Sequence, residues 1–110
     1  MRKNSLKTAF LENTPIVNGW LAIPSGYSAE IMGHQGYDAV TVDLQHGMID
    51  FASALSMLQA LSSTPAVPLV RVADNDPAQI MRVLDAGAYG VICPMFSSAD
   101  QARRFVAACR

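Results

Sequence analysis

Short apolar runs alternate with amphipathic stretches along the 110-residue chain. The short runs predict β-strands at 18–23, 38–43, 67–72 and 90–95. Apolar residues at helical spacing predict helices at 4–12, 28–36, 50–63, 75–88 and 97–109. Successive strands begin roughly 20–30 residues apart, which is the length of a βα unit. The pattern therefore predicts a chain of repeated βα units.

Capping signals mark the ends of several predicted helices. Side chains that can accept from a first-turn N–H group precede four of them, at Asn4, Asp50, Asp76 and Ser98. Gln79 and Gln101, three residues after two of these caps, predict two capping boxes. Gly87 can adopt the left-handed conformation that ends a helix.

Four βα units without a hairpin signal indicate a parallel sheet. An open doubly wound sheet is one alternative, although "IPSGYS" after the first strand has a single glycine and no glycine-rich phosphate loop. The strands end near Pro24, Asp43, Arg71 and Pro94, and (βα)₈ barrels gather their chemistry at such ends. A complete barrel takes about 250 residues. We therefore expect residues 1–110 to form a single partial domain, the N-terminal half of a TIM (βα)₈ barrel with about four βα units and an N-terminal helix.

Composition narrows the possible partners. The chain is 51% hydrophobic and 15% charged, as in ordinary globular domains, and its net charge of −1 argues against nucleic-acid binding. No segment reaches the ~18 apolar residues of a membrane span, and Glu12 and Asn13 interrupt the basic opening before a signal-peptide core. Cys93 and Cys109 lack metal-binding spacing and predict free thiols in a reducing, cytoplasmic setting.

The stretch "VDLQHG" at 42–47 places an acid and a histidine where an apolar strand stops. Strand alternation puts Val40 and Val42 under the helices and points Asp43 towards the barrel axis. The same alternation in "PLVRV" points Arg71 inward. Asp43 and Arg71 are thus predicted to converge at one strand end, with His46 in the loop above them.

These residue types can support proton transfer and anion binding. An ionised Asp43 could accept from a ring N–H of His46 and leave the other ring nitrogen free as a base. Arg71 could hold a carboxylate, a keto oxygen or an enolate. The structural alternatives are a turn-forming Asp43, a solvated His46, and a Trp20 that belongs to the core instead of lining a pocket.

Two long segments together resemble the HpcH/HpaI aldolase family. They are "NGWLAIPSGYSAEIMGHQGYDAVTVDLQHG" and "PLVRVADNDPAQIMRVLDAGAYGVICPM". The family comprises class II, metal-dependent pyruvate aldolases built on a (βα)₈ barrel, typified by 4-hydroxy-2-oxoheptane-dioate aldolase. The resemblance implies a carbon–carbon lyase that cleaves 4-hydroxy-2-oxo acids into pyruvate and an aldehyde through a metal-bound pyruvate enolate.

Several residue roles follow from the resemblance alone. The family motif of Asp, any residue, Glu or Gln, His and Gly matches Asp43, Gln45, His46 and Gly47. It implies that His46 and Asp43 act as an acid/base pair, and that Arg71 contacts the keto oxygen of pyruvate. Trp20 and Gln45 would help to bind substrate, although many members carry Glu where this chain has Gln45.

The resemblance also implies a divalent metal ion, Mg²⁺, Mn²⁺ or Co²⁺, held by a Glu and an Asp on later strands. Those strands are not in the 110 residues, so no metal ligand is expected among them. We therefore expect the isolated chain to be inactive, as a piece of a longer protein, a truncated product or a half that associates, with a homo-oligomer favoured. The alternatives are a citrate-lyase β-type barrel lyase and a non-catalytic half barrel.

Overall fold

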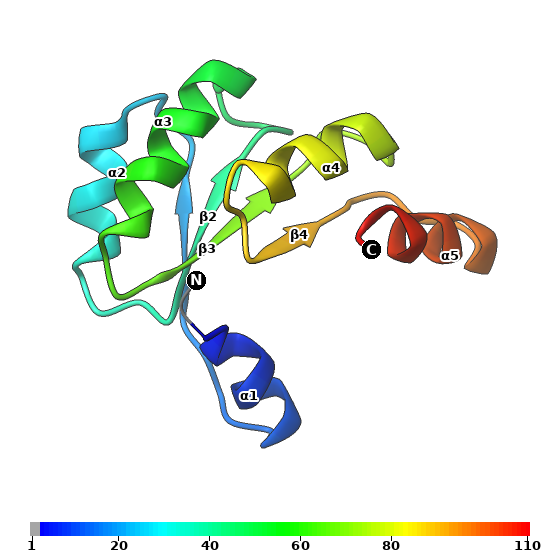
Figure 1. Ribbon diagram of the computed structural model, residues 1–110, viewed down its shortest axis with the longest axis horizontal. Coiled ribbons are helices and arrows are strands. Elements are labelled where there is room, and N and C mark those ends of the chain that lie inside the picture. Colours follow the sequence, from blue (N-terminus) through cyan, green and yellow to red (C-terminus); the bar gives the residue numbers. More distant parts are fainter. Residues whose placement is uncertain (1–2) are drawn as a thin grey trace.

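Helices and strands alternate along the computed structural model, which describes residues 3–110 (Figure 1). The helices in this range are α1 (Ser5–Leu11), α2 (Gly26–Gly33), α3 (Phe51–Ser62), α4 (Pro77–Asp85) and α5 (Ala99–Ala108). The strands are β1 (Asn18–Leu21), β2 (Ala39–Asp43), β3 (Val67–Arg71) and β4 (Gly90–Ile92). Every helix and strand predicted from the sequence is therefore present.

The strands form one parallel sheet whose spatial order, β1-β2-β3-β4, follows the chain. Trp20 on β1 is level with Thr41 on β2, and Asp43 on β2 is level with Arg71 on β3. The α/β fold with a parallel sheet is thus confirmed. The register also brings the carboxyl ends of β2 and β3 to the same height.

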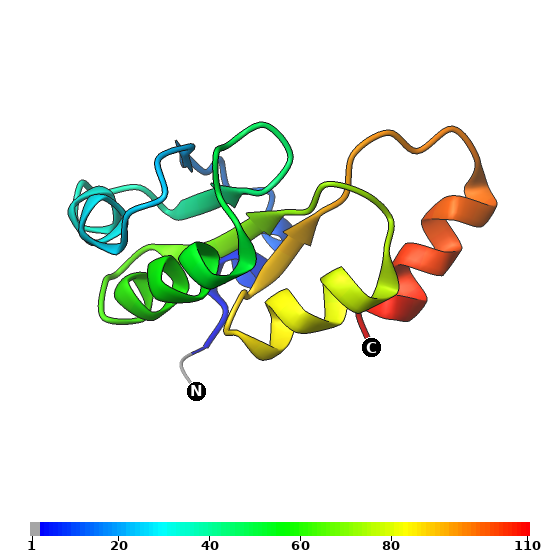
Figure 2. The ribbon, with the colours of Figure 1, turned by 90° about the horizontal axis from the view of Figure 1, so that it is seen from above.

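One face of the sheet, which we call the helix-covered face, carries most of the core. Its strand residues pack against buried residues of α2, α3 and α4, and the fully buried members on the strands are Val40, Val42 and Val70. Figure 2 shows α3 and α4 on the same side of the sheet. Buried aliphatic area contributes about 25 cal/mol per Å², so this face is the main source of stability.

The opposite face, which we call the open face, is covered only at its lower end. There Leu6 of α1 packs with Ala39 and Val67, together with partly buried Ile16 and Leu69. Figure 1 shows α1 below the strands and apart from the other helices. The upper part of this face, at the carboxyl ends of the strands, has no helix over it.

Some predicted boundaries were wrong by a few residues. The second helix begins at Gly26 instead of residue 28, because the Ser25 side chain accepts from the Ser28 N–H and caps it, and it ends at Gly33. The last strand ends at Ile92 instead of residue 95. Pro94 lacks an N–H for the ladder, and Met95 adopts a left-handed φ of 63°.

The predicted caps are largely confirmed. Asn4, Asp50, Asp76 and Ser98 each accept from a first-turn N–H, and the Ser98–Gln101 pair forms a complete capping box. Gly87 has the left-handed φ of 108°. Gln79 is the exception, because its side-chain oxygen accepts from the Ala73 N–H at 3.0 Å. It therefore ties the loop before α4 to that helix.

The two edges of the sheet and the last helix are less covered than its centre. β1 and β4 are the edge strands, and none of the described residues of α5 is buried. α5 packs beside α4, and the rings of Phe96 and Phe105, whose centroids lie 5.4 Å apart, tie it to the loop after β4. Within residues 3–110, each helix falls short of the length and apolarity that crossing a membrane requires.

Candidate active site

The carboxyl ends of β1, β2 and β3 bring three predicted site residues together on the open face. Asp43 ends β2 and Arg71 ends β3, and the two are register partners in the parallel ladder. Trp20 lies on β1, one strand further along. The convergence of Asp43 and Arg71 that alternation predicts is therefore present in the structure.

Asp43 and Arg71 form a two-pronged ion pair. Arg71 Nη2 donates to Asp43 Oδ2 at 2.6 Å, and Arg71 Nε donates to Asp43 Oδ1 at 2.9 Å. The Asp43 side chain is 8% exposed and that of Arg71 is 22% exposed. Parallel charge-assisted bonds of this kind hold both groups in a fixed plane. The pair is thus a rigid element at the strand ends.

The ion pair moves both pKa values in the direction that keeps it charged. The hydrogen bond from Arg71 lowers the pKa of Asp43, against the opposing effect of burial, and the backbone N–H groups of His46 and Gln45 lower it further. The hydrogen bond to Asp43 raises the pKa of Arg71. Asp43 is therefore ionised at neutral pH and is unsuited to accepting a proton there.

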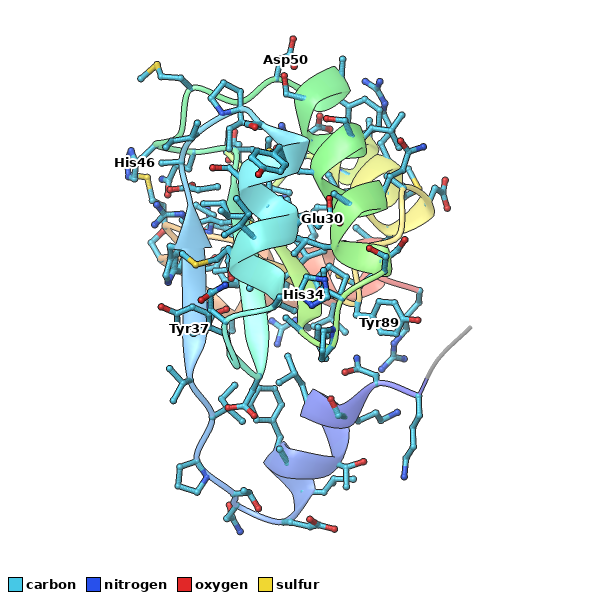
Figure 3. The ribbon with its side chains drawn as sticks, turned by 90° about the vertical axis from the view of Figure 1, so that its left-hand side faces the viewer. Glu30, His34, Tyr37, His46, Asp50 and Tyr89 are labelled. Atoms are coloured by element: carbon cyan, nitrogen blue, oxygen red, sulfur yellow. The ribbon has the colours of Figure 1, made fainter. Side chains whose placement is uncertain are left out.

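His46 meets Asp43 through its backbone and not through its ring. Asp43 Oδ1 accepts from the N–H of Gln45 at 3.0 Å and from the N–H of His46 at 3.2 Å. Among residues 3–110, the contacts of the Asp43 carboxylate are these two and Arg71, so the expected ring N–H bond from His46 is wrong for this structure. The His46 residue is exposed, and Figure 3 shows it projecting away from the sheet.

The loop after β2 is packed tightly enough to require a glycine. A Cβ added at Gly47 would lie 2.3 Å from the Asp43 carbonyl oxygen and 3.2 Å from the Ala22 Cα, both backbone atoms that cannot move aside cheaply. The next residue, Met48, donates its N–H to the Ala22 carbonyl at 3.3 Å. Gly47 therefore lets the loop that carries His46 lie close over the end of β1.

Trp20 contacts Arg71 directly. The Arg71 Cζ lies 4.6 Å from the centroid of the Trp20 ring, within the range of a cation–π interaction. Trp20 remains 45% exposed. It is thus neither a core residue nor a free surface residue.

Asn18 and Thr41 join the site, although sequence reasoning did not propose them as functional. Thr41 is completely buried, and its hydroxyl is bonded to the Asn18 amide. Both lie on the open face, two residues before Trp20 and Asp43 respectively. Period-two alternation counted back from Trp20 and Asp43 would have found them.

A large pocket lies at the other end of the open face. Its volume is about 440 Å³, and it lies between α1 and the lower part of the sheet. The lining is mostly apolar and comprises Asn4, Leu6, Lys7, Phe10, Ile16, Asn18, Leu69, Tyr89, Gly90, Val91 and Ile92. Asp43, His46 and Arg71 are not among these residues, so we place the chemistry at the strand ends instead.

The described residues do not make a metal centre by themselves. Residues 3–110 contain no group of three or more His, Cys, Asp or Glu side chains placed to hold a metal ion. Asp43, the acid at the strand ends, already accepts from Arg71 and from two backbone N–H groups. A metal at this site would need ligands from elsewhere.

Comparison with known sequences gives a consistent family. A sequence model described as "HpcH/HpaI aldolase/citrate lyase" matches residues 18–110. A "Hydroxypyruvate/pyruvate aldolase" from Rhizorhabdus wittichii is 42% identical over 105 residues, covering 96% of this chain and 42% of that protein. A "4-hydroxy-2-oxo-heptane-1,7-dioate aldolase" from Salmonella dublin is 40% identical over 108 residues, covering 98% of this chain and 41% of that protein.

Solved structures agree with the sequence comparison. An HpcH/HpaI aldolase/citrate lyase family protein from Burkholderia cenocepacia superposes with a TM-score of 0.90 at 34% identity, over 98% of this chain and 43% of that one. The chain thus spans about two fifths of the length of the relatives it matches. The likeness agrees with part of the barrel expected from the sequence.

Proposed function

The chain belongs to the HpcH/HpaI aldolase/citrate lyase family, and from this premise we propose that Asp43, His46 and Arg71 are part of the active site of an aldehyde-lyase. The reaction is the retro-aldol cleavage of a 4-hydroxy-2-oxo acid to pyruvate and an aldehyde. The observation that carries the proposal is the fixed Asp43–Arg71 pair at the carboxyl ends of adjacent parallel strands. Barrel enzymes place their catalytic groups at this end.

Arg71 is suited to bind the oxyanion that develops in this reaction. A guanidinium has five N–H donors, and Asp43 accepts from Nε and Nη2. The Nη1 edge is left to face a substrate, so Arg71 can hold the keto oxygen of pyruvate while its other edge is fixed. Preorganised donors of this kind stabilise the negative charge of an enolate.

We assign the proton transfer to His46, whose ring is exposed at the strand ends and carries a nitrogen that can act as a general base. In the cleavage direction the ring accepts the proton of the 4-hydroxyl group, and the C3–C4 bond breaks as the aldehyde carbonyl forms. The electron pair of that bond moves onto C3 and the C2 oxygen, giving the enolate of pyruvate. A proton then adds at C3 to give pyruvate.

Asp43 supports both partners in this scheme. It holds Arg71 through its carboxylate and the backbone of His46 through Oδ1. Trp20 and Gln45 would line the space for substrate, since Trp20 is partly exposed beside Arg71 and Gln45 lies in the loop between Asp43 and His46. The presence of Gln45 in place of an acid would make the loop less negative.

We include a divalent metal, Mg²⁺, Mn²⁺ or Co²⁺, in the proposal because the resemblance to the family implies one. When bound, such an ion would polarise the oxygens of a 2-oxo acid. Because the described residues do not fit a metal centre, its ligands would have to come from outside these 110 residues. We therefore propose that the chain alone has little or no aldolase activity.

A chimera tests the proposal, because the chain matches a defined segment of longer aldolases. The chain would replace the segment it matches in the Rhizorhabdus wittichii protein, and pyruvate release would be assayed with 4-hydroxy-2-oxo acids and each of the three metals. We expect turnover that falls by at least ~100-fold in Arg71→Ala, the scale of losing an oxyanion donor. Arg104→Ala, an exposed arginine on α5, is the matched control. Full turnover by Arg71→Ala would exclude the role of Arg71.

Two other functions deserve the same assay. A citrate-lyase β-type enzyme is favoured by the family description itself, which includes citrate lyase, and it would act on an acyl-thioester in place of a free oxo acid. A non-catalytic half barrel is favoured by the uncovered edge strands and by α5, none of whose described residues is buried. Turnover of thioesters alone would support the former, and an inactive but stable chimera the latter.

The same uncovered surfaces support a homo-oligomer. Edge strands with unpaired backbone groups associate readily, and β1 and β4 are both edges. Light scattering of the 110-residue chain would show a defined oligomer on this proposal and a monomer otherwise. Cys93 and Cys109 are free thiols, in keeping with a reducing, cytoplasmic environment.

A further inference from the structure

The side chain of Arg71 lies across three strands of the open face. Arg71 is on β3 and Trp20 on β1, so the two are separated by β2. Neighbouring strands lie about 4.8 Å apart, and the guanidinium must therefore lean over β2 to bring its Cζ within 4.6 Å of the indole centroid. Where the guanidinium crosses β2, its Nε and Nη2 donate to the Asp43 carboxylate.

These contacts hold the guanidinium in two different ways. Asp43 fixes its position within the plane of the group, through two parallel hydrogen bonds. The Trp20 ring provides a surface for the cation outside that set of bonds. The two hydrogen bonds to Asp43 run along one edge of the guanidinium and restrain it least against tilting out of its plane, and the Trp20 ring restricts that tilt.

The Trp20 ring is itself held by a polar residue. With its amide oxygen turned towards the indole, Asn18 accepts from Trp20 Nε1 at 3.3 Å and from the Thr41 hydroxyl at 2.9 Å. In the same orientation the Asn18 amide nitrogen donates to the Ala39 carbonyl at 3.2 Å. Thr41 is completely buried, so Asn18 links the indole to a buried residue of β2.

We propose that Trp20 is a positioning residue that aims the oxyanion-binding edge of Arg71, and that Asn18 sets the orientation of the Trp20 ring. The inference deepens the proposed function and rests on it for the identity of the ligand. In this positioning role, which is separate from any contact of Trp20 with substrate, Trp20 affects catalysis through Arg71. Loss of the ring is expected to weaken oxyanion binding by about twofold to thirtyfold, the range of one partly exposed cation–π contact.

Nuclear magnetic resonance of the ¹⁵N-labelled 110-residue chain gives a direct readout. The Nε–H signal of Arg71, assigned by its disappearance in Arg71→Lys, should carry an upfield ring-current shift relative to a chain without the indole, because the guanidinium lies next to the Trp20 ring. We expect Trp20→Leu to abolish that shift, Trp20→Phe to keep part of it, and Asn18→Ala to reduce it. Tyr27→Leu removes an aromatic that is 76% exposed on α2 and should leave the signal unchanged.

Oxalate is the probe for binding, because it presents the paired oxyanions of a pyruvate enolate. Titration of each variant, with thermal unfolding to confirm that it is folded, should give weaker binding to Trp20→Leu than to Tyr27→Leu. An Arg71 signal and an oxalate affinity in folded Trp20→Leu equal to those of the unaltered chain would overturn the inference. If Trp20→Leu does not fold, an unchanged Arg71 signal in both Trp20→Phe and Asn18→Ala would overturn it.

The failure of the proposed function would look different. In that case the metal-loaded chimera would release no pyruvate from 4-hydroxy-2-oxo acids, while the Arg71 signal of the 110-residue chain would still move in Trp20→Leu. A positioning role for Trp20 would then stand, but for an arginine with another ligand. The two inferences can therefore fail separately.

Discussion

The two faces of the sheet are made by alternate residues of the same strands, yet they have different roles. On the helix-covered face, Val40, Val42 and Val70 are fully buried among the side chains of α2, α3 and α4. On the open face, Thr41, Asp43 and Arg71 each follow one of these valines in sequence, and they are hydrogen-bonded, Thr41 to Asn18 and Asp43 to Arg71. One face therefore stabilises the fold, and the other holds charged groups in fixed positions.

The difference shows that the buried polar side chains of the open face have hydrogen-bond partners within the fold. Asp43 is nearly buried, and its carboxylate is matched by Arg71 and by two backbone N–H groups. Thr41 is completely buried and is matched by Asn18. Unmatched buried polar groups are costly, so each of these side chains has its own partner on a neighbouring strand or loop.

The largest effect should come from placing a charge on the wrong face of β3. Val70→Asp would bury an unpaired carboxylate beneath the helices and cost more than about 4 kcal/mol, enough to abolish cooperative unfolding. Leu69→Asp, one residue earlier, faces the pocket on the open face and should cost only about 1–2 kcal/mol. Urea unfolding followed by circular dichroism compares them. Equal losses would show that the faces do not differ as described.

A smaller effect is expected from breaking the ion pair. Arg71→Met leaves Asp43 buried without its cation, so the pKa of Asp43 should rise and the urea midpoint should fall. Asp43→Asn keeps an oxygen for the Gln45 and His46 N–H groups and should lower the midpoint less. The pKa would be read from the carboxyl ¹³C signal.

Arg82→Met is the control for this prediction. Arg82 is exposed, and its Cζ lies 3.9 Å from the Phe51 ring. Its loss removes an arginine–aromatic contact without leaving a buried carboxylate unpaired, and it should have the smallest effect of the three. A midpoint as low as that of Arg71→Met would mean that the Asp43 contact is not what matters.

Two substitutions at adjacent residues, one that replaces a methyl by a hydroxyl and one that does the reverse, test the two faces further. Val42→Thr puts a hydroxyl among the apolar side chains of the helix-covered face and should cost about 1–3 kcal/mol. Thr41→Val removes a hydroxyl whose partner, Asn18, is only half-buried and can reach water, so about 1 kcal/mol is expected. Chemical denaturation of both variants measures the difference. A reversed order would contradict the assignment of the two faces.

The smallest effect is the dependence of stability on pH. The pKa of Asp43 is lowered in the folded chain, chiefly by Arg71. Its contribution to stability is therefore present above the unfolded pKa, about 3.9 for an ordinary Asp. That contribution is lost as the pH falls through the lower folded value.

Asp43→Asn isolates this contribution, because other lowered carboxyls such as Asp50 stay in both proteins. The stability difference between the unaltered chain and Asp43→Asn should be constant near neutral pH and should shrink below about pH 4. Urea unfolding from pH 6 to pH 2 would measure it. A difference that stays constant to pH 2 would show that Arg71 does not stabilise the ionised form.

Much of the fold could be predicted because its signals are local. Apolar runs located the strands, and Asn4, Asp50, Asp76 and Ser98 located helix starts to within a residue. Strand alternation was enough to bring Asp43 to Arg71, because register partners on parallel strands face the same side. The predicted element boundaries were wrong where the backbone conformation of a single residue ends the element, as near Met95.

The details of the site could not be predicted, because they depend on competition between partners. The backbone N–H of His46 takes the Asp43 oxygen that its ring was expected to take, and a tight loop through Gly47 makes this possible. The contact between Trp20 and Arg71 depends on a long side chain crossing a whole strand. Neither a turn nor a side-chain path of this kind is encoded in spacing.

Enolate stabilisation by Arg71 is the central claim, and proton exchange tests it most directly. Pyruvate in D₂O would be incubated with the metal-loaded chimera, and loss of the C3 methyl signal would report enolate formation without any aldehyde. We predict exchange by the chimera and by Arg104→Ala, and a rate at least ~100-fold lower in Arg71→Ala. Equal exchange rates in Arg71→Ala and the unaltered chimera would contradict the account.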